Sequence, residues 1–206
     1  MVDTQKAEAG PYPRLVFVVD LPLVARFFLL LQQGVKIRRR VGCSVDAFLR
    51  EEIGVSPATI EKIQSIMLDG KPVDDISSAL IHDGSVLALS AAMPGVVGAT
   101  LRRGGAYASL RSGITYHETG KACMTGEGWV IIKIFNLLMA ELGPGLLRQG
   151  VLVKTSDLAE LLAERGPELQ QGCSVTLDGI SIDIRTLGGD ATLAATDQIF
   201  LSVSSA

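Results

Sequence analysis

The chain is poor in the residues on which metal sites and nucleophilic catalysis depend. Its 206 residues include three cysteines, two histidines and one tryptophan, and the cysteines form no C-x-x-C pair. An odd number of cysteines without that spacing favours a reducing compartment over a disulfide framework. No H-E-x-x-H, G-x-S-x-G or phosphate-loop pattern is present. The sequence therefore predicts no metal, no cofactor and no catalytic residue.

Strong net charge and long apolar runs are also missing. The formal net charge is −3, which argues against the concentrated basic face of a nucleic-acid-binding protein. The apolar stretch RLVFVVDLPLVARFFLLL is interrupted by Asp20, Pro22 and Arg26, so it falls short of the roughly 18 to 20 apolar residues of a membrane span. It also lacks the layout of a signal peptide. We expect no nucleic-acid partner, no membrane partner and a cytoplasmic location.

The chain does have ample apolar material and an internal repeat. Hydrophobic residues make up 48% of the sequence and charged residues 20%, which is enough to build packed cores. Three segments of the first half recur in the same order in the second half. The matched pairs are Gln32–Gly54 with Arg148–Gly166, Ile66–Asp75 with Val175–Ile184, and Asp83–Ala92 with Asp197–Ala206. An ordered series of matches indicates a duplicated unit.

Each copy predicts one main helix. Ser44 is a suitable N-cap, and the apolar residues after it recur at helical spacing. In the second copy Ser156 takes the capping position, and Gly166-Pro167 is expected to end the helix. The short segment Gly143–Gly150, between two hydrophobic runs, is expected to be a turn.

Strands surround each predicted helix. Asp69-Gly70 and Asp178-Gly179 predict two-residue hairpin turns, because this dipeptide tolerates positive φ angles. A hydrophobic run precedes each helix, Leu15–Val19 in the first copy and Val130–Phe135 in the second, and a short apolar strand closes each copy. Each copy therefore predicts an α+β unit in which a mixed sheet of four or five strands packs on one main helix.

This pattern resembles the β-grasp superfamily of ubiquitin-like proteins, and within it the sulfur-carrier branch. That branch contains the small subunit of molybdopterin synthase and the sulfur carrier of the thiamine pathway. The likeness lies in VIIKIFNLLMAELGPG and GVLVKTSDLAELLAERGPEL of the second half and in VLALSAAMPGVVGA of the first. It implies two tandem β-grasp domains at residues 15–99 and 128–206. A flexible tail at 1–14 would precede them, and a glycine-rich linker at 100–127 would join them.

In such carriers a C-terminal Gly-Gly ends in a carboxylate that a partner enzyme adenylates, and glycines let the tail enter a narrow channel. This sequence departs from that pattern. The first copy has Gly98-Ala99 at the corresponding place, and the second copy ends at Ala206 directly after a strand. Gly104-Gly105 would become such a tail only if a peptidase cut after Gly105. The favoured interpretation is that this glycine pair belongs to the linker.

Basic residues supply the candidate partner-binding surface. Lys36, Arg38 and Arg40 alternate along a predicted strand and therefore share one of its faces. Arg102 and Arg103 directly precede the glycine pair. A solvated strand face is the favoured interpretation of the first group, and docking of a protein partner is the second.

His117, Glu118 and Cys123 form the remaining candidate cluster. Together they could act as a metal or Cys–His site, but they supply too few ligands for a structural zinc site. They could also belong to a small-molecule enzyme site at the domain junction, although no convergent polar cluster is visible in the sequence.

The sequence favours a non-catalytic, tandem ubiquitin-like or sulfur-carrier-like protein that acts by recognising a protein partner. That partner could be an activating enzyme of a conjugation or sulfur-transfer pathway. The first alternative is a precursor that a processing peptidase cuts after Gly105 to release a modifier or sulfur carrier. The second is a small-molecule enzyme with a site at the domain junction.

Overall fold

The computed structural model describes residues 11–118 and 125–206 and confirms the predicted α+β class. The strands are β1 (Arg14–Val19), β2 (Val35–Val41), β3 (Ser65–Leu68), β4 (Lys71–Pro72), β5 (Val86–Ser90), β6 (Gly126–Phe135), β7 (Val151–Lys154), β8 (Cys173–Leu177), β9 (Ile180–Ile182) and β10 (Gln198–Ser205). The α-helices are α1 (Phe28–Gln33), α2 (Val45–Ala47), α3 (Pro57–Lys62), α4 (Gly95–Leu101), α5 (Leu138–Gln149), α6 (Thr155–Leu169), α7 (Ile184–Leu187) and α8 (Ala191–Ala194). Shorter helical turns are the 3-10 helices η1 (Leu21–Phe27) and η3 (Ala108–Arg111) and the π-helical η2 (Phe48–Glu52).

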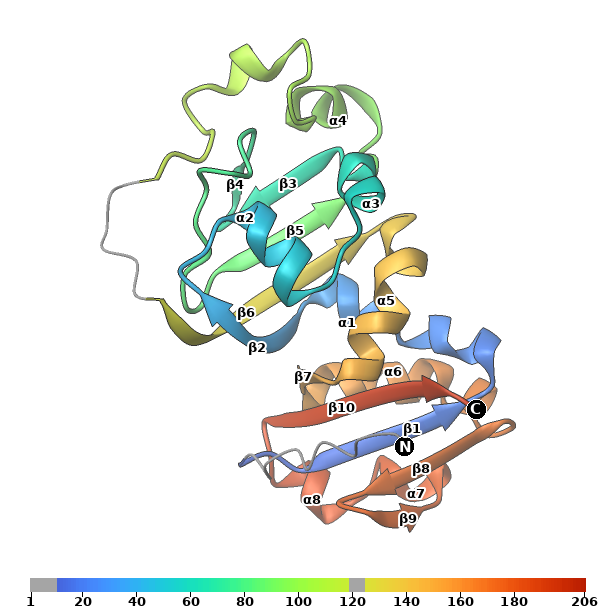
Figure 1. Cartoon of the computed structure of the whole chain (residues 1–206). Helices are drawn as coiled ribbons and strands as arrows, with labels where there is room; N and C mark the ends of the chain where they lie inside the picture. Colours follow the sequence, from blue (N-terminus) through green and yellow to red (C-terminus); the bar gives the residue numbers. More distant parts are fainter. Residues whose placement is uncertain (1–10, 119–124) are drawn as a thin grey trace.

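The strands of the described residues form one mixed sheet in the order β4-β3-β5-β6-β2-β7-β10-β1-β8-β9. The prediction of two separate sheets is therefore wrong. We call β4-β3-β5-β6-β2 the first half-sheet and β7-β10-β1-β8-β9 the second half-sheet; they are the upper and lower parts of Figure 1. A single residue pair, Lys36 with Leu152, joins β2 to β7. The sheet is therefore continuous, but the pairing between its two half-sheets is short.

One strand was expected to open each repeat, β1 in the first and β6 in the second. Each of these two strands lies instead in the half-sheet of the other repeat. β1 was expected to pair within residues 15–99, but it lies parallel to β10 and antiparallel to β8. β6 was expected to pair within residues 128–206, but it lies antiparallel to β2 and parallel to β5. Each half-sheet therefore contains one strand from the other repeat.

Helical connections explain why these strands leave their own repeats. Strands that pair as a hairpin are usually joined by a short turn. Here η1 and α1 separate β1 from β2, and the twelve-residue helix α5 separates β6 from β7. The prediction that Gly143–Gly150 forms a turn is thus wrong, because these residues continue α5 up to its C-cap at Gly150. A helix of this length does not hold the two strands side by side.

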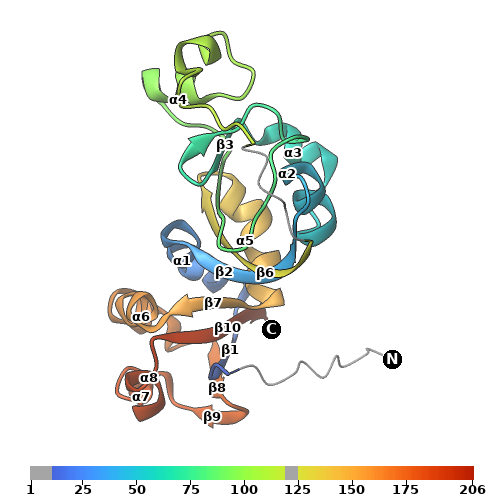
Figure 2. The same ribbon diagram turned by 90° about the vertical axis from the view of Figure 1, so that its left-hand side faces the viewer.

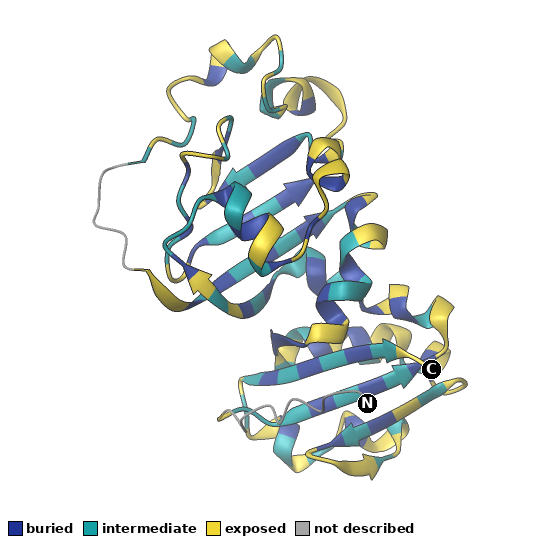
Figure 3. Cartoon of the chain, viewed as in Figure 1, coloured by how far each residue is buried: buried dark blue, intermediate teal, exposed yellow. Residues whose placement is uncertain are grey.

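Helices cover opposite sides of the two half-sheets. In Figure 2, α2 and α3 lie on the right of the first half-sheet, whereas α6, α7 and α8 lie on the left of the second. Figure 3 shows the alternation of buried and partly buried residues along most strands. The largest fully buried side chains include Phe17 of β1, Phe27 of η1 and Phe48 of η2. Phe17 and Phe27 meet edge to face, with 5.0 Å between ring centroids.

The local predictions succeed better in the first repeat than in the second. The Ser44 hydroxyl accepts a hydrogen bond from the Ala47 backbone N–H at 3.2 Å, so the predicted cap is confirmed. Ser156 does not cap its helix, which begins at Thr155; its hydroxyl donates to the Asp157 carboxylate instead. The helix also continues through Gly166-Pro167 to Leu169. A proline so close to a helix end removes only one intrahelical hydrogen bond.

Both predicted hairpin turns are confirmed. Asp69 and Gly70 have φ angles of 51° and 79°, and Asp178 and Gly179 have φ angles of 50° and 83°. The Asp69 carboxylate also accepts from the Val86 backbone N–H at 2.7 Å. The same turn chemistry therefore holds both hairpins.

Candidate interaction face

The face of the first half-sheet opposite α2 and α3 carries both apolar and basic side chains. Residues that pair across neighbouring strands point to the same face of a sheet. Lys36, Ile131 and Val86 form one such row, and Lys133, Ala88 and Met67 form the next. All six are only partly buried, whereas the residues that alternate with them on β6, Val130, Ile132 and Ile134, are fully buried. We call this surface the open face.

An apolar hollow of about 270 Å³ lies at one end of the open face. Its lining includes Met67, Ala88 and Phe135 from three adjacent strands, together with Met93 and Pro94 just after β5. Met93 is 38% exposed, and it adds to the apolar lining of the hollow. The hollow therefore presents apolar surface to the solvent.

The wall of this hollow is fixed by hydrogen bonds. Asn136, with a φ angle of 59°, turns the chain after β6, and its side-chain amide donates to the Ser90 hydroxyl at 3.0 Å. The same amide donates to the Ala92 carbonyl. These bonds tie the end of β6 to the segment after β5, so the hollow is preformed.

A second hollow, of about 240 Å³, lies where the first half-sheet meets the start of α6. Lys36 of β2, Lys133 of β6 and Lys154 of β7 line it, together with Asp157 in the first turn of α6. We call it the lysine cavity. It brings together basic residues of both repeats.

The structure separates the predicted basic strand residues. Lys36 borders the lysine cavity. Arg38 is exposed, with its Nε 3.8 Å from the Glu127 carboxylate. Arg40 is held by η2, because its Nη2 lies 2.5 Å from Glu51 and its Nε 3.2 Å from Glu52. The hydrogen bond to Glu51 raises the pKa of the Arg40 guanidinium. The three residues therefore do not form one surface, and Lys36 lines the lysine cavity.

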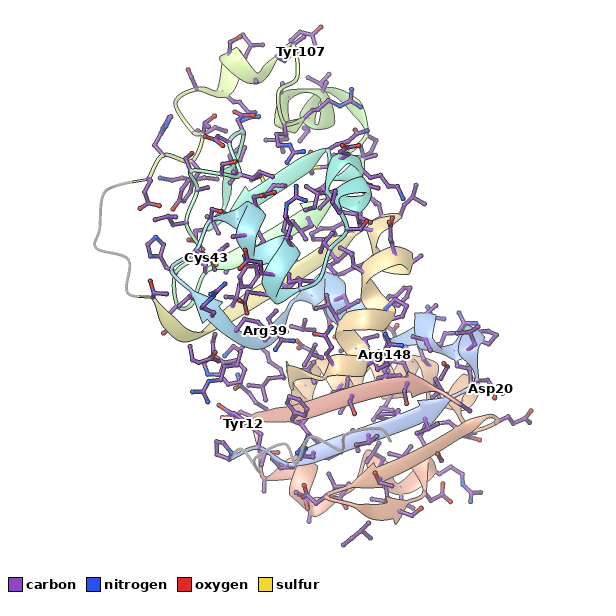
Figure 4. The ribbon with its side chains drawn as sticks, viewed as in Figure 1. Tyr12, Asp20, Arg39, Cys43, Tyr107 and Arg148 are labelled. Carbon is purple, nitrogen blue, oxygen red and sulfur yellow. The ribbon has the colours of Figure 1, made fainter. Side chains whose placement is uncertain are left out.

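Arg39, which alternates with these residues, fastens the junction between the half-sheets. Its Nε donates to the Glu52 carbonyl at 3.1 Å, and its Nη2 donates to Gln149 Oε1 at 2.6 Å. Figure 4 shows Arg39 between the first half-sheet and the lower end of α5, close to Arg148. Its role is to hold the two repeats together.

The glycine pair Gly104-Gly105 lies in a compact turn. The Gly105 backbone N–H donates to the Arg102 carbonyl at 3.1 Å, and the Gly104 N–H donates to the Asp74 carboxylate at 3.2 Å. Arg102 also donates through its guanidinium to Gln64 Oε1 at 2.6 Å, and the Arg103 N–H donates to the Gln64 carbonyl at 2.7 Å. These two arginines therefore hold the turn against the start of β3.

Arg111 is the anchor of this segment and is only 5% exposed. It forms a two-pronged ion pair with Asp74, with nitrogen–oxygen distances of 2.6 and 3.0 Å. Its remaining donors reach the carbonyls of Thr100 and Arg102 at 2.6 and 3.2 Å. Arg111 is not recognisable from the sequence, because nothing in the pattern around it distinguishes it from a solvated linker arginine. Tyr107, at the outer end of the segment in Figure 4, is exposed.

The histidine cluster differs from the one considered in the sequence. His117 is exposed, and Cys123 lies outside the described residues. Glu118 accepts from the Tyr116 hydroxyl at 2.9 Å and lies 3.7 Å from Nε2 of His82. Partial burial raises the pKa of Glu118, but the Tyr116 hydrogen bond and His82 outweigh this effect and leave the pKa below its usual value. In residues 11–118 and 125–206, no group of three or more potential ligands is arranged to hold a metal ion.

Two residues of the lysine cavity were also missed. Lys133 interrupts the apolar strand VIIKIF, and this lone charge was the available signal. Lys154 follows VLV in the same way. Their meeting with Lys36 depends on the strand exchange, which local sequence patterns do not reveal.

Comparison with known proteins gives no relative: no family model, curated protein or solved structure matches the chain. Within the described residues, no helix combines the length and apolar character needed to cross a bilayer.

Proposed function

We propose that this protein is a non-catalytic, ubiquitin-like protein that recognises a protein partner through its open face. Each half-sheet contains five strands in mixed orientation, and a main helical segment follows β2 in one and β7 in the other. This composition supports a pair of β-grasp units that have exchanged one strand each. Because fold alone does not determine function, the proposal depends on the surface rather than on the resemblance.

The observation that carries the proposal is the apolar hollow on the open face. Interface centres are enriched in Met and aromatic residues, and anchors in preformed pockets contribute most of the binding energy. Met93 and Phe135 border such a pocket here. Ala88 also lines this pocket, and Lys133 pairs directly with Ala88 on the neighbouring strand. The partner is expected to offer an apolar anchor flanked by acidic residues.

The position of Gly104-Gly105 favours recognition over release of a modifier. A peptidase needs an extended chain in its active site, whereas this pair is folded into a turn beside Asp74. Cleavage after Gly105 would first require the Arg111–Asp74 ion pair to open. The precursor alternative therefore has an additional cost that partner binding avoids.

A capture experiment with matched variants tests this function. Wild-type protein, Met93→Asp and Leu137→Asp are immobilised and exposed to lysate of the cells that naturally produce the protein. Bound proteins are then quantified by mass spectrometry. Met93 borders the hollow, whereas Leu137 is 80% exposed outside it, so both variants add the same charge at an accessible site.

The proposal predicts a protein that wild type and Leu137→Asp retain equally and that Met93→Asp loses. If all three capture the same set, or if no protein is enriched over an empty matrix, the open face is not a docking site. Thermal unfolding of both variants shows whether a loss of binding reflects a loss of fold.

A further inference from the structure

The lysine cavity has the character of an anion site that lies apart from the apolar hollow. Lys36 and Lys133 are partly buried, and Lys154 is exposed at its rim. Asp157 is the only acidic residue in the described lining. Three positive charges and one negative charge leave the lining with a net charge of +2. A cavity of about 240 Å³ has room for a small oxyanion with water.

The side chains of these three lysines have no partner among the residues that the structure describes. No hydrogen bond or ion pair joins them to another residue within 11–118 or 125–206. By contrast, Lys62 lies 3.1 Å from Glu141, and Arg26 lies 2.7 Å from Glu168. Positive charges that line one cavity attract a small anion, and within the described chain none of these three is neutralised by an ion pair such as that of Lys62 or Arg26.

Two further features shape the cavity for an anion. Gly34 has a φ angle of 115°, and a Cβ added there would lie 3.0 Å from Lys133 Cε. The missing side chain therefore lets Lys133 lie close against the backbone at the end of α1. Lys154 is the N-cap of the fifteen-residue helix α6, whose N-terminus contributes additional positive potential. Both features favour negative charge at the same place.

Asp157 would distinguish between oxyanions with and without a hydroxyl, because a carboxylate accepts hydrogen bonds but has none to donate. One of its oxygens, Oδ1, accepts from the Ser156 hydroxyl at 3.0 Å, whereas Oδ2 accepts no hydrogen bond from the described residues. An oxyanion without a hydroxyl, such as sulfate, would be repelled by this group. Inorganic phosphate at neutral pH carries a P–OH that can donate to it.

We propose that the lysine cavity binds a protonated phosphate group, with Lys36, Lys133 and Lys154 donating to its oxygens and Asp157 accepting its hydroxyl. The group is supplied either by inorganic phosphate, which carries a hydroxyl at neutral pH, or by the monoanion of a small phosphate monoester, which carries one below its second pKa of about 6. The cavity shares Lys36 and Lys133 with the open face, but it does not share the lining of the apolar hollow. The capture experiment changes Met93, whereas the anion experiment changes the lysines, so the failure of one proposal is distinguishable from the failure of the other.

Isothermal titration calorimetry of the full chain at pH 7 and low ionic strength tests the site. The probes are inorganic phosphate, methyl phosphate and sulfate. Wild type is expected to bind phosphate with a one-to-one stoichiometry and more tightly than sulfate. Lys133→Gln and Lys154→Gln are each expected to weaken phosphate binding about tenfold or more, because each removes a charge-assisted hydrogen bond. Lys71→Gln, at an exposed position on β4, is the control and leaves binding unchanged.

Asp157→Asn tests the selectivity. An asparagine side chain offers a donor, so sulfate binding is expected to rise and the preference for phosphate to shrink. Lys154 is exposed, so its substitution keeps the test valid even if Lys133→Gln does not fold. Methyl phosphate and inorganic phosphate are also compared at about pH 5.5, where both carry a P–OH, and this comparison distinguishes the two sources of the group. The proposal is overturned if wild type binds no phosphate, if both lysine variants bind it as tightly as wild type, or if sulfate binds equally well.

Discussion

The two half-sheets are built from the same repeat but completed differently. In the first, the exchanged strand β6 lies between β2 and β5, the second and closing strands of that repeat. In the second, the exchanged strand β1 lies between the closing strand β10 and β8. The repeated sequence therefore determines which helices and strands form. It does not determine how the first two strands of each copy pair, because helices separate these strands. Each half-sheet therefore needs a strand from the other repeat to be complete.

The largest expected effect on stability comes from a core residue that belongs to one repeat in the sequence but lies in the half-sheet formed mainly by the other repeat. Phe17 belongs to the first repeat, yet it is fully buried in the second half-sheet opposite Val175 and Val203. Phe17→Ala is expected to lower the free energy of unfolding by about 3–5 kcal/mol. Hydrogen exchange should show the greatest loss of protection in β8 and β10.

Phe48→Ala is the matched control for this substitution. Phe48 is equally buried but lies in η2, over the first half-sheet. Its removal should expose amides of β2 and β5 first. If Phe17→Ala instead exposes β2 and β5 and leaves β8 and β10 protected, the assignment of β1 to the second half-sheet is wrong.

The glycines of two matching Gln-Gly pairs, Gln33-Gly34 and Gln149-Gly150, sharpen the comparison, because they occupy equivalent positions of the repeat. Gly34 and Gly150 follow α1 and α5 with φ angles of 115° and 94°. A Cβ at Gly150 would lie 2.3 Å from the Phe200 ring, whereas a Cβ at Gly34 would meet the flexible Lys133 side chain at 3.0 Å. Gly150→Ala is expected to cost about 2–4 kcal/mol and Gly34→Ala about 1–3 kcal/mol. Urea unfolding of both variants measures the difference; equal costs would show that Phe200 moves aside freely.

Arg111 holds the segment that follows β5 in the first repeat. Arg111→Ala leaves the Asp74 carboxylate without its main partner, and a loss of about 2–3 kcal/mol is expected. Limited trypsin digestion should then cut at Arg102 and Arg103 much faster than in wild type. Arg185→Ala removes an exposed ion pair with Asp183 and should change neither property. Resistance of Arg111→Ala to trypsin would refute the anchoring role.

The smallest effect concerns the two described thiols. Burial raises the pKa of Cys173 to about 11 and also raises the pKa of Cys43, where Arg40 partly opposes the shift. Folding therefore favours the neutral thiol of Cys173. This contribution is fully present below the unfolded pKa near 9 and is lost as the pH rises through about 11.

Peptide-resolved alkylation with iodoacetamide at pH 9 measures this effect. Native Cys173 should react roughly fifty-fold more slowly than the same thiol in urea, in proportion to its lower thiolate fraction. Equal rates in the native and unfolded states would contradict the pKa shift. Cys173→Ala should also lose less stability than wild type between pH 9 and 11.

Local chemistry was readable from the sequence, whereas long-range pairing was not. The two Asp-Gly hairpins and the Ser44 cap depend on neighbouring residues only, and they were predicted correctly. The exchange of β1 and β6 depends on α5, whose Gly143, Pro144 and Gly145 look like a turn in one dimension. In space α5 packs against β10 and β6, and this tertiary contact overrides the weak local propensity.

The candidate sites likewise depend on contacts between residues that lie far apart in the sequence. Lys36 was identified from alternation along one strand, but Lys133 and Lys154 join it only because strands of both repeats meet at the junction. The apolar hollow likewise combines β3, β5 and β6, which no contiguous segment contains. Arg111 was invisible for a similar reason, since its partner Asp74 lies 37 residues away.

Nuclear Overhauser contacts of β1 in solution test the strand exchange most directly, because they report strand neighbours without any substitution. The account predicts cross-strand contacts from Phe17 to Val203 and to Val175, together with contacts from Val130 on β6 to Ile37 on β2. Contacts from residues 14–19 to residues 35–41 or 86–90, in place of these, would show that each repeat closes its own sheet.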